Sequence, residues 1–181
     1  MPASQEQTWT VEQYLELERT SEVKHEYLDG YIYAMTGASA NHNVIAVNTA
    51  ARLHAQLRQR PCTVFPGDQR VKADRLYAYP DISVVCSTPQ YTDESPRTLL
   101  NPTAIVEVLS PTTEKFDRGA KSWHYRELDS LQEYLLTAQD RYHIEHYVLQ
   151  PDGAWLLKDA VGLEARQELT SIGCTLALAD V

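Results

Sequence analysis

Tyr79-Pro80-Asp81-Ile82-Ser-Val-Val-Cys86 and Ala104-Ile-Val-Glu107-Val-Leu109 are the stretches that decide the fold. Both contain nearly continuous apolar runs, which are typical of strands buried on both faces of a sheet. Proline cannot donate to a β ladder, so Pro80 marks the start of the first strand and places Asp81 at its head. Glu107 lies inside the second run, where burying a carboxylate is costly unless it is paired or binds a metal.

These two acids predict a metal site. If the strands are neighbours, Asp81 and Glu107 converge at one end of a sheet and repel each other. A hard divalent cation removes that repulsion and prefers oxygen ligands. Such a site can polarise a phosphate and generate hydroxide from bound water. The alternative is a pair of capped or salt-bridged acids with no metal.

Periodicity and turn signals place further elements around these strands. Helices are expected at 10–19, with a capping box of Thr10 and Gln13, at 41–58 after Asn41, and at 114–128 after Thr112 or Thr113. A hairpin with an Asp29-Gly30 turn is expected at 25–35. The other expected strands are 62–65, 69–73, 133–136, 143–149 and 155–158, and 87–102 reads as a loop. This order predicts an α/β (α+β) fold whose mixed central sheet is flanked by helices.

Composition agrees with one globular domain over 1–181, with its core at about 10–157. The 181 residues are 43% hydrophobic and contain no repeat or linker. No apolar run reaches the roughly 20 residues of a membrane span, and Met1 to Gln7 do not resemble a secretory signal. The three cysteines, Cys62, Cys86 and Cys174, match no zinc or disulfide pattern, so reduced thiols and a cytoplasmic location are expected.

The net charge of −9 counts against a large phosphate-driven nucleic-acid footprint. The charge is uneven, however. The stretch from Arg52 to Arg75 carries six basic and two acidic residues. A local basic face is therefore compatible with an acidic chain, although ordinary solvated surface explains single residues equally well.

Several motifs in order resemble the Uma2 (DUF820) family. They are Lys24-His-Glu-Tyr-Leu-Asp-Gly30, Gly37-Ala-Ser-Ala-Asn-His42-Asn43, Tyr79-Pro-Asp81, Ile105-Val-Glu-Val-Leu-Ser-Pro-Thr112, Asp117-Arg-Gly-Ala-Lys121 with Tyr125, and Glu133-Tyr-Leu-Leu136. The resemblance runs from about residue 10 to 157. It implies a restriction-endonuclease-like sandwich of the PD-(D/E)XK class, magnesium dependence (Mn²⁺ as a substitute) and hydrolysis of phosphodiester bonds.

The resemblance also implies roles for individual residues. Asp81, Glu107 and the Val108 carbonyl would bind the metal. The usual motif has lysine two residues after the glutamate, but Leu109 stands there, and Lys121 from the following helix is the expected replacement. Glu26 resembles the extra acidic residue that many such nucleases carry, which would support the metal shell. Two further candidates follow from their places in the chain: His42, at a helix start, as a contact to substrate phosphate or to Glu26, and Lys72, on the strand before Asp81, as a substitute lysine.

The resulting hypothesis is an endodeoxyribonuclease that acts on DNA, functions as a homodimer and has no membrane partner. Its rival is a non-catalytic nucleic-acid or protein-binding module on a nuclease scaffold, and a third possibility is cleavage of RNA or branched junctions. A zinc site at the histidines is disfavoured, because His143 and His146 are three apart in an expected strand and face opposite sides. No Gly-x-Ser-x-Gly elbow or cysteine–histidine pattern supports nucleophilic catalysis.

Overall fold

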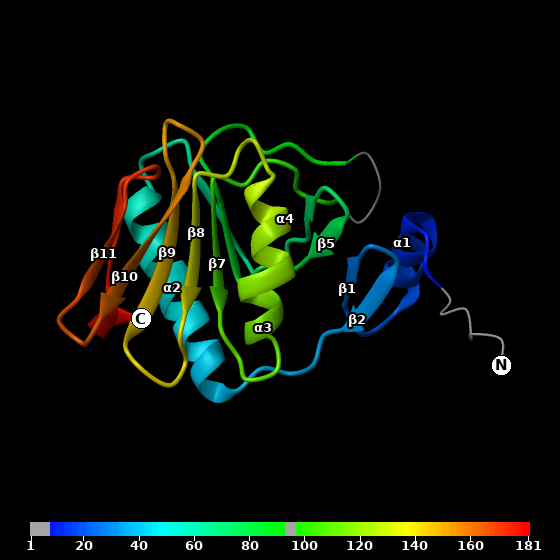
Figure 1. Cartoon of the computed structure of the whole chain (residues 1–181), viewed down its shortest axis with the longest axis horizontal. Coiled ribbons are helices and arrows are strands. Elements are labelled where there is room, and N and C mark those ends of the chain that lie inside the picture. The colour runs from blue at the N-terminus through cyan, green and yellow to red at the C-terminus, as the bar shows by residue number, and fades with distance from the viewer. Residues whose placement is uncertain (1–7, 93–96) are drawn as a thin grey trace.

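The computed structural model describes residues 8–92 and 97–181 and contains a central six-stranded mixed sheet (Figure 1). Its strand order is β10-β9-β8-β7-β6-β3, with β3 at Thr63–Pro66, β6 at Ile82–Val85, β7 at Ala104–Val108, β8 at Glu133–Thr137, β9 at His143–Leu149 and β10 at Trp155–Val161. All neighbours are antiparallel except β7 and β8, which are parallel. A parallel pair needs a crossover, and helices supply it here.

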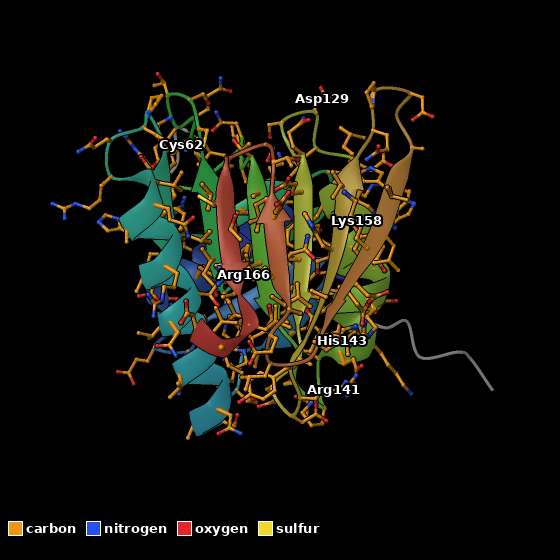
Figure 2. The ribbon with its side chains drawn as sticks, turned by 90° about the vertical axis from the view of Figure 1, so that its left-hand side faces the viewer. Cys62, Asp129, Arg141, His143, Lys158 and Arg166 are labelled. Atoms are coloured by element: carbon orange, nitrogen blue, oxygen red, sulfur yellow. A yellow bond between two sulfur atoms is a disulfide. The ribbon has the colours of Figure 1, made fainter. Side chains whose placement is uncertain are left out.

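Helices cover both faces of this sheet. The crossover from β7 to β8 runs through α3 (Glu114–Phe116), a π-helical turn (Asp117–Lys121) and α4 (Ser122–Arg126), which lie in front of the sheet in Figure 1. The long helix α2 (Ala40–Leu57) lies on the other face, where Leu53 and Leu57 pack against Ile82, Val84 and Val106. A hairpin of β11 (Arg166–Leu169) and β12 (Cys174–Ala177) lies beside α2 (Figure 2), and the 3₁₀ turn Leu178–Asp180 follows it.

A second, smaller sheet supports the N-terminal helix. Its order is β2-β1-β5-β4, with β1 at His25–Leu28, β2 at Tyr31–Ala34, β4 at Val71–Ala73 and β5 at Leu76–Ala78. Helix α1 (Val11–Thr20) covers it through a cluster of three tyrosines, Tyr14, Tyr27 and Tyr77. This sheet matters for function because β1 carries Glu26 and β5 leads into Tyr79 and Asp81.

The expected fold class is confirmed, and so are several local signals. Thr10 and Gln13 form the capping box of α1. Asp29 and Gly30 have φ values of 49° and 90°, as a two-residue hairpin turn requires. The expected cap at Asn41 is wrong: the N-cap is Ser39, two residues earlier, and its hydroxyl accepts the His42 N–H at 3.1 Å.

The strand and cap expectations miss other details. Neither Thr112 nor Thr113 caps the third helical segment by a side-chain hydrogen bond: Thr113 stands at its N-cap without one, and both hydroxyls bond to Ser110 instead. β5, β11 and β12 were not expected, because strands of three or four residues give little periodicity. The segment at 69–73 belongs to the small sheet and not to the central one. The expectation about Met1 to Gln7 lies outside the described residues.

The expectation of three reduced cysteines is wrong for two of them. Cys62 and Cys86 form a disulfide, while Cys174 is free and buried. Thr63 pairs with Val85 across β3 and β6, so the two cysteines occupy the next position of the same antiparallel register. Residues 24 apart in the sequence therefore face each other through strand pairing, which a spacing rule cannot see. The cytoplasmic location that rested on free thiols stays a prediction.

Breaking this disulfide is expected to lower the free energy of unfolding by about 3 kcal/mol, because the cross-link removes loop-closure entropy from the unfolded chain. Urea unfolding with and without reductant measures the change. The Cys62→Ser/Cys86→Ser variant is the control, since reductant should not shift its midpoint. An unchanged wild-type midpoint after complete reduction would contradict the expectation.

None of the helices within residues 8–92 and 97–181 combines the length and the apolar character that a membrane span requires.

Buried His146 in β9 predicts acid sensitivity. Burial, with a smaller effect of Lys158, lowers the pKa of His146 to about 4, and its Nδ1 bonds to the Gln167 amide at 2.6 Å. An unfolded histidine has a pKa of about 6.5, so the unfolded chain binds this proton more tightly. Stability is therefore lost as pH falls from about 6.5 to about 4, by up to about 3 kcal/mol.

Urea unfolding of wild type and His146→Gln at pH 7 and pH 5 tests this. The stability difference between the two pH values should be smaller in the variant. Burial raises the pKa of Glu133, and its Oε2 lies 3.8 Å from His146 Nε2, so Glu133→Gln is measured beside His146→Gln to separate the two groups. Equal pH dependence in wild type and His146→Gln would refute the assignment to His146.

Candidate metal and catalytic site

Strand register places Asp81 and Glu107 opposite each other. Ile82 pairs with Val106 in the antiparallel β6–β7 ladder, so Asp81 and Glu107 occupy the next position, where β6 begins and β7 ends. Side chains directly opposite in such a pair lie on the same face. Asp81 Oδ2 accepts the Val108 N–H at 2.7 Å, and the Asp81 N–H lies 3.4 Å from Glu107 Oε2. The expected convergence of the two acids is present.

The Lys121 ammonium lies among three carboxylates. Its Nζ is 2.9 Å from Glu26 Oε1, 3.0 Å from Glu107 Oε1 and 3.2 Å from Asp117 Oδ1. Its side chain is only 5% exposed. Lys121 ends the π-helical turn, and π-helical turns occur frequently at functional sites. The structure thus brings Lys121 to the end of β7. Leu109, which stands where the usual motif has its lysine, is buried in the core.

Glu26 reaches this cluster from the small sheet. It is buried in β1, and its Oε1 accepts the Tyr79 N–H at 3.2 Å as well as contacting Lys121. Tyr79 is two residues before Asp81 in the chain. Glu26 therefore connects the small sheet both to the segment that leads into β6 and to the Lys121 ammonium.

Two tyrosines and Asp117 complete the cluster, and none of the three was among the expected site residues. The Tyr125 hydroxyl donates to Glu107 Oε1 at 3.2 Å, and the Tyr134 hydroxyl donates to the Asp117 carbonyl at 3.0 Å. A signal for two of them was present in the sequence: Asp117, Lys121 and Tyr125 recur every four residues, which puts them on one side of a helix.

The carboxyl groups of the cluster outnumber its one ammonium, Lys121. Burial raises the pKa of Glu107 well above its usual value, and neighbouring Asp117, Asp81 and Glu26 add to the effect while Lys121 opposes it. Burial alone would lower the pKa of Lys121, but Glu107 and Glu26 outweigh it and hold this pKa well above its usual value. Lys121 is therefore a permanent ammonium. Three carboxyl groups contact Lys121, and Asp81 adds a fourth to the cluster opposite Glu107, so one ammonium does not balance them and the cluster attracts a further cation.

His42 contacts Asp81 from the first turn of α2. Its Nε2 is 3.2 Å from Asp81 Oδ2, and its side chain is 14% exposed. The hydrogen bond with Asp81 raises the pKa of His42, although burial opposes it. The structure thus places His42 beside Asp81, and its expected contact to Glu26 is not among the described interactions.

Lys72 lies elsewhere. It belongs to β4 of the small sheet, and its Nζ is 5.5 Å from the centre of the Tyr77 ring. In the described parts of the chain no ion pair joins it to Asp81, Glu107 or Glu26. The structure does not bring Lys72 into the cluster, because β4 pairs with β5 and not with β6.

A hollow of about 560 Å³ adjoins this end of the sheet. It lies between the start of α2 and the turn after β7, and its lining includes Asn41, Leu109, Ser110, Glu114 and Arg141. Figure 2 shows Arg141 at the end of the sheet where α2 begins, opposite the end that carries Cys62. Residues 41 and 109 are chain neighbours of His42 and Val108, so the hollow lies next to the cluster.

The residues present fit a hard divalent cation. Asp81 and Glu107 offer carboxylate oxygens from facing positions, and excess negative charge surrounds them. Lys121 contacts Glu107 Oε1, and the bond from Asp81 N–H to Oε2 is long, so Oε2 keeps acceptor capacity. Carboxylate oxygens with a backbone carbonyl are the donors that Mg²⁺ and Mn²⁺ favour.

Comparison with known proteins gives a consistent result. The model of the family Uma2, described as "Putative restriction endonuclease", matches residues 11–179. Two Synechocystis proteins are each 37% identical to this chain. The match to sll1609 runs over 163 residues and covers 89% of this chain and 92% of that protein. The match to slr1290 runs over 169 residues and covers 92% of this chain and 87% of that protein. A crystal structure titled as a "putative nuclease belonging to DUF820" from Anabaena variabilis has a TM-score of 0.77 at 19% identity and covers 94% of this chain and 96% of its own.

Proposed function

Because this chain belongs to the Uma2 family, we propose that it is a metal-dependent endonuclease that hydrolyses phosphodiester bonds in nucleic acid, with DNA as the substrate. One observation carries the proposal: a buried ammonium, Lys121, is held by three carboxylates, and one of these, Glu107, faces Asp81 across the strand pair. A purely structural core gains little from such a cluster, since well-packed apolar residues are often equally stable. Clusters of perturbed ionisable groups are instead typical of active sites.

Asp81, Glu107 and the Val108 carbonyl would hold Mg²⁺, with Mn²⁺ as a substitute. A bound divalent cation supplies Lewis acidity toward the phosphate and lowers the pKa of coordinated water. The Val108 N–H fixes Asp81 Oδ2, and the Tyr125 hydroxyl fixes Glu107 Oε1. These bonds orient both carboxylates before any ion binds, which reduces the reorganisation needed on binding.

Lys121 would act as a donor of hydrogen bonds. Its raised pKa keeps it protonated, so it cannot take a proton from water. An ammonium at this position can orient the attacking water and stabilise the charge that develops on the phosphate. Glu26 and Asp117 act on it as positioning residues, because their contacts fix the Nζ beside Glu107.

The rival is a binding module that keeps the nuclease scaffold without catalysis. The net charge of −9 favours it, because nucleic-acid affinity depends largely on neutralising phosphates. RNA or branched junctions are further substrate possibilities. A homodimer stays a prediction, which sedimentation velocity at several protein concentrations would check.

Calorimetric titration of Mg²⁺ and Mn²⁺, combined with plasmid nicking on the same samples, tests the proposal. We expect metal binding by the wild-type chain and nicking that stops when a chelator is added. Metal binding without cleavage of any DNA, RNA or junction substrate would support the rival, a non-catalytic binding module on the nuclease scaffold. Absence of metal binding would overturn the proposed site itself.

A further inference from the structure

We propose that His42 is a metal ligand of this site and that its imidazole makes the chain prefer Mn²⁺ to Mg²⁺. The inference rests on the proposed function, because it assumes the cation site at Asp81 and Glu107. It goes beyond that site by adding a nitrogen donor to an otherwise all-oxygen set. It also assigns His42 a role other than contact with substrate phosphate.

The position of the imidazole supports this assignment. His42 Nε2 is 3.2 Å from Asp81 Oδ2, and the other ring nitrogen, Nδ1, is buried without a hydrogen-bond partner among the described residues. Asp81 is one of the three groups proposed to hold the cation, and the ring nitrogen Nε2 is directed at its carboxylate.

His42 is also held on a rigid element. It lies in the first turn of the 18-residue helix α2, and its backbone N–H donates to the Ser39 hydroxyl at 3.1 Å. Lower on the same helix, Leu53 and Leu57 are fully buried against the central sheet. A ligand on a packed, capped helix is held in position before a cation binds, so little reorganisation of the imidazole is needed.

The chemistry of the donor then sets the preference among metals. Mg²⁺ favours oxygen donors and retains most of its water, whereas imidazole suits first-row transition metals. One nitrogen added to two carboxylates and a carbonyl should therefore strengthen Mn²⁺ binding more than Mg²⁺ binding. Deleting the imidazole should remove that difference and leave the oxygen donors in place.

The opposite possibility makes a distinct prediction. If the imidazole only occupies the metal position in the absence of a cation, then a cation must displace it. Its removal would then strengthen binding of Mg²⁺ and Mn²⁺ alike. Affinities for the two ions, measured on one variant, thus separate a ligand from a competitor.

The experiment compares wild type, His42→Asn and, as a matched control, His54→Asn, which changes an exposed histidine on the same helix. Calorimetry gives the Mn²⁺ and Mg²⁺ affinities, and electron spin echo envelope modulation of bound Mn²⁺ reports a directly coordinated nitrogen. We expect ¹⁴N modulation in wild type and His54→Asn but not in His42→Asn. The Mn²⁺ affinity of His42→Asn should fall at least about tenfold, with little change for Mg²⁺.

The outcomes separate this inference from the proposed function. Mn²⁺ bound by wild type without ¹⁴N modulation, or equal changes for both ions in His42→Asn, would overturn the role of His42 and leave the proposed nuclease standing. Absence of Mn²⁺ binding in wild type would overturn both. Circular dichroism and thermal unfolding of each variant confirm that a loss of binding does not reflect a loss of fold.

Discussion

Asp81→Asn is expected to abolish measurable Mg²⁺ binding and to slow plasmid nicking by about a thousandfold or more. Asparagine has nearly the same shape and can still accept the Val108 N–H, which Asp81 Oδ2 accepts at 2.7 Å. The change removes the negative charge and leaves Glu107 as the only carboxylate of the facing pair. Metal-assisted polarisation of a phosphate contributes several kcal/mol, and each 1.4 kcal/mol is about a factor of ten in rate.

Calorimetry and a nicking time course measure this result together. Asp152→Asn is the matched control, because Asp152 lies in the exposed turn between β9 and β10. Both variants should unfold near the wild-type temperature. Asp81→Asn that still binds Mg²⁺ and nicks DNA at the wild-type rate would show that the facing acids are not the catalytic centre.

Replacing Lys121 with methionine is expected to damage activity and stability at once. Methionine fills a similar volume without charge, so Glu26, Glu107 and Asp117 keep their buried positions but lose their common partner. Removing one member of a buried ion pair typically costs about 3–5 kcal/mol. Loss of the positioned donor should also reduce nicking by about 10²–10⁴-fold.

Lys115→Met separates this effect from a general effect of charge, because Lys115 is exposed in α3, two residues before the π-helical turn. It should change the free energy of unfolding by less than about 0.5 kcal/mol. Urea unfolding and nicking rates, both at saturating Mg²⁺, check the two variants. Lys121→Met with wild-type stability would mean that the three carboxylates are already neutral, and wild-type nicking would remove Lys121 from the mechanism.

Much of this site could be predicted from the order of residues in the chain. Pro80 marks the start of β6 and so the position of Asp81, and the apolar run around Glu107 indicates a buried strand with one carboxylate in it. These are local properties: a residue type, its neighbours and their periodicity are enough. The hairpin turn at Asp29-Gly30 and the capping box at Thr10 belong to the same class, and the structure confirms both.

Other features depend on pairings between distant segments. The disulfide exists because β3 and β6 are antiparallel neighbours, so Cys62 meets Cys86. Lys72 is outside the cluster because β4 joins the small sheet. The place of Asp117 in the cluster follows from the π-helical turn and its packing against the strand ends, although its spacing to Lys121 and Tyr125 was visible.

The sequence by itself therefore determined the mixed α+β architecture, the family and the two strand-borne acids, since strand and turn preferences act within a few residues. Only the tertiary structure decided which groups surround those acids. Glu26, His42, Lys121 and Tyr125 come from four separate elements, and they meet because the small sheet, α2 and the crossover helices all pack at one end of β6 and β7. Burial against those elements, and not any local preference, makes the charges act on each other strongly.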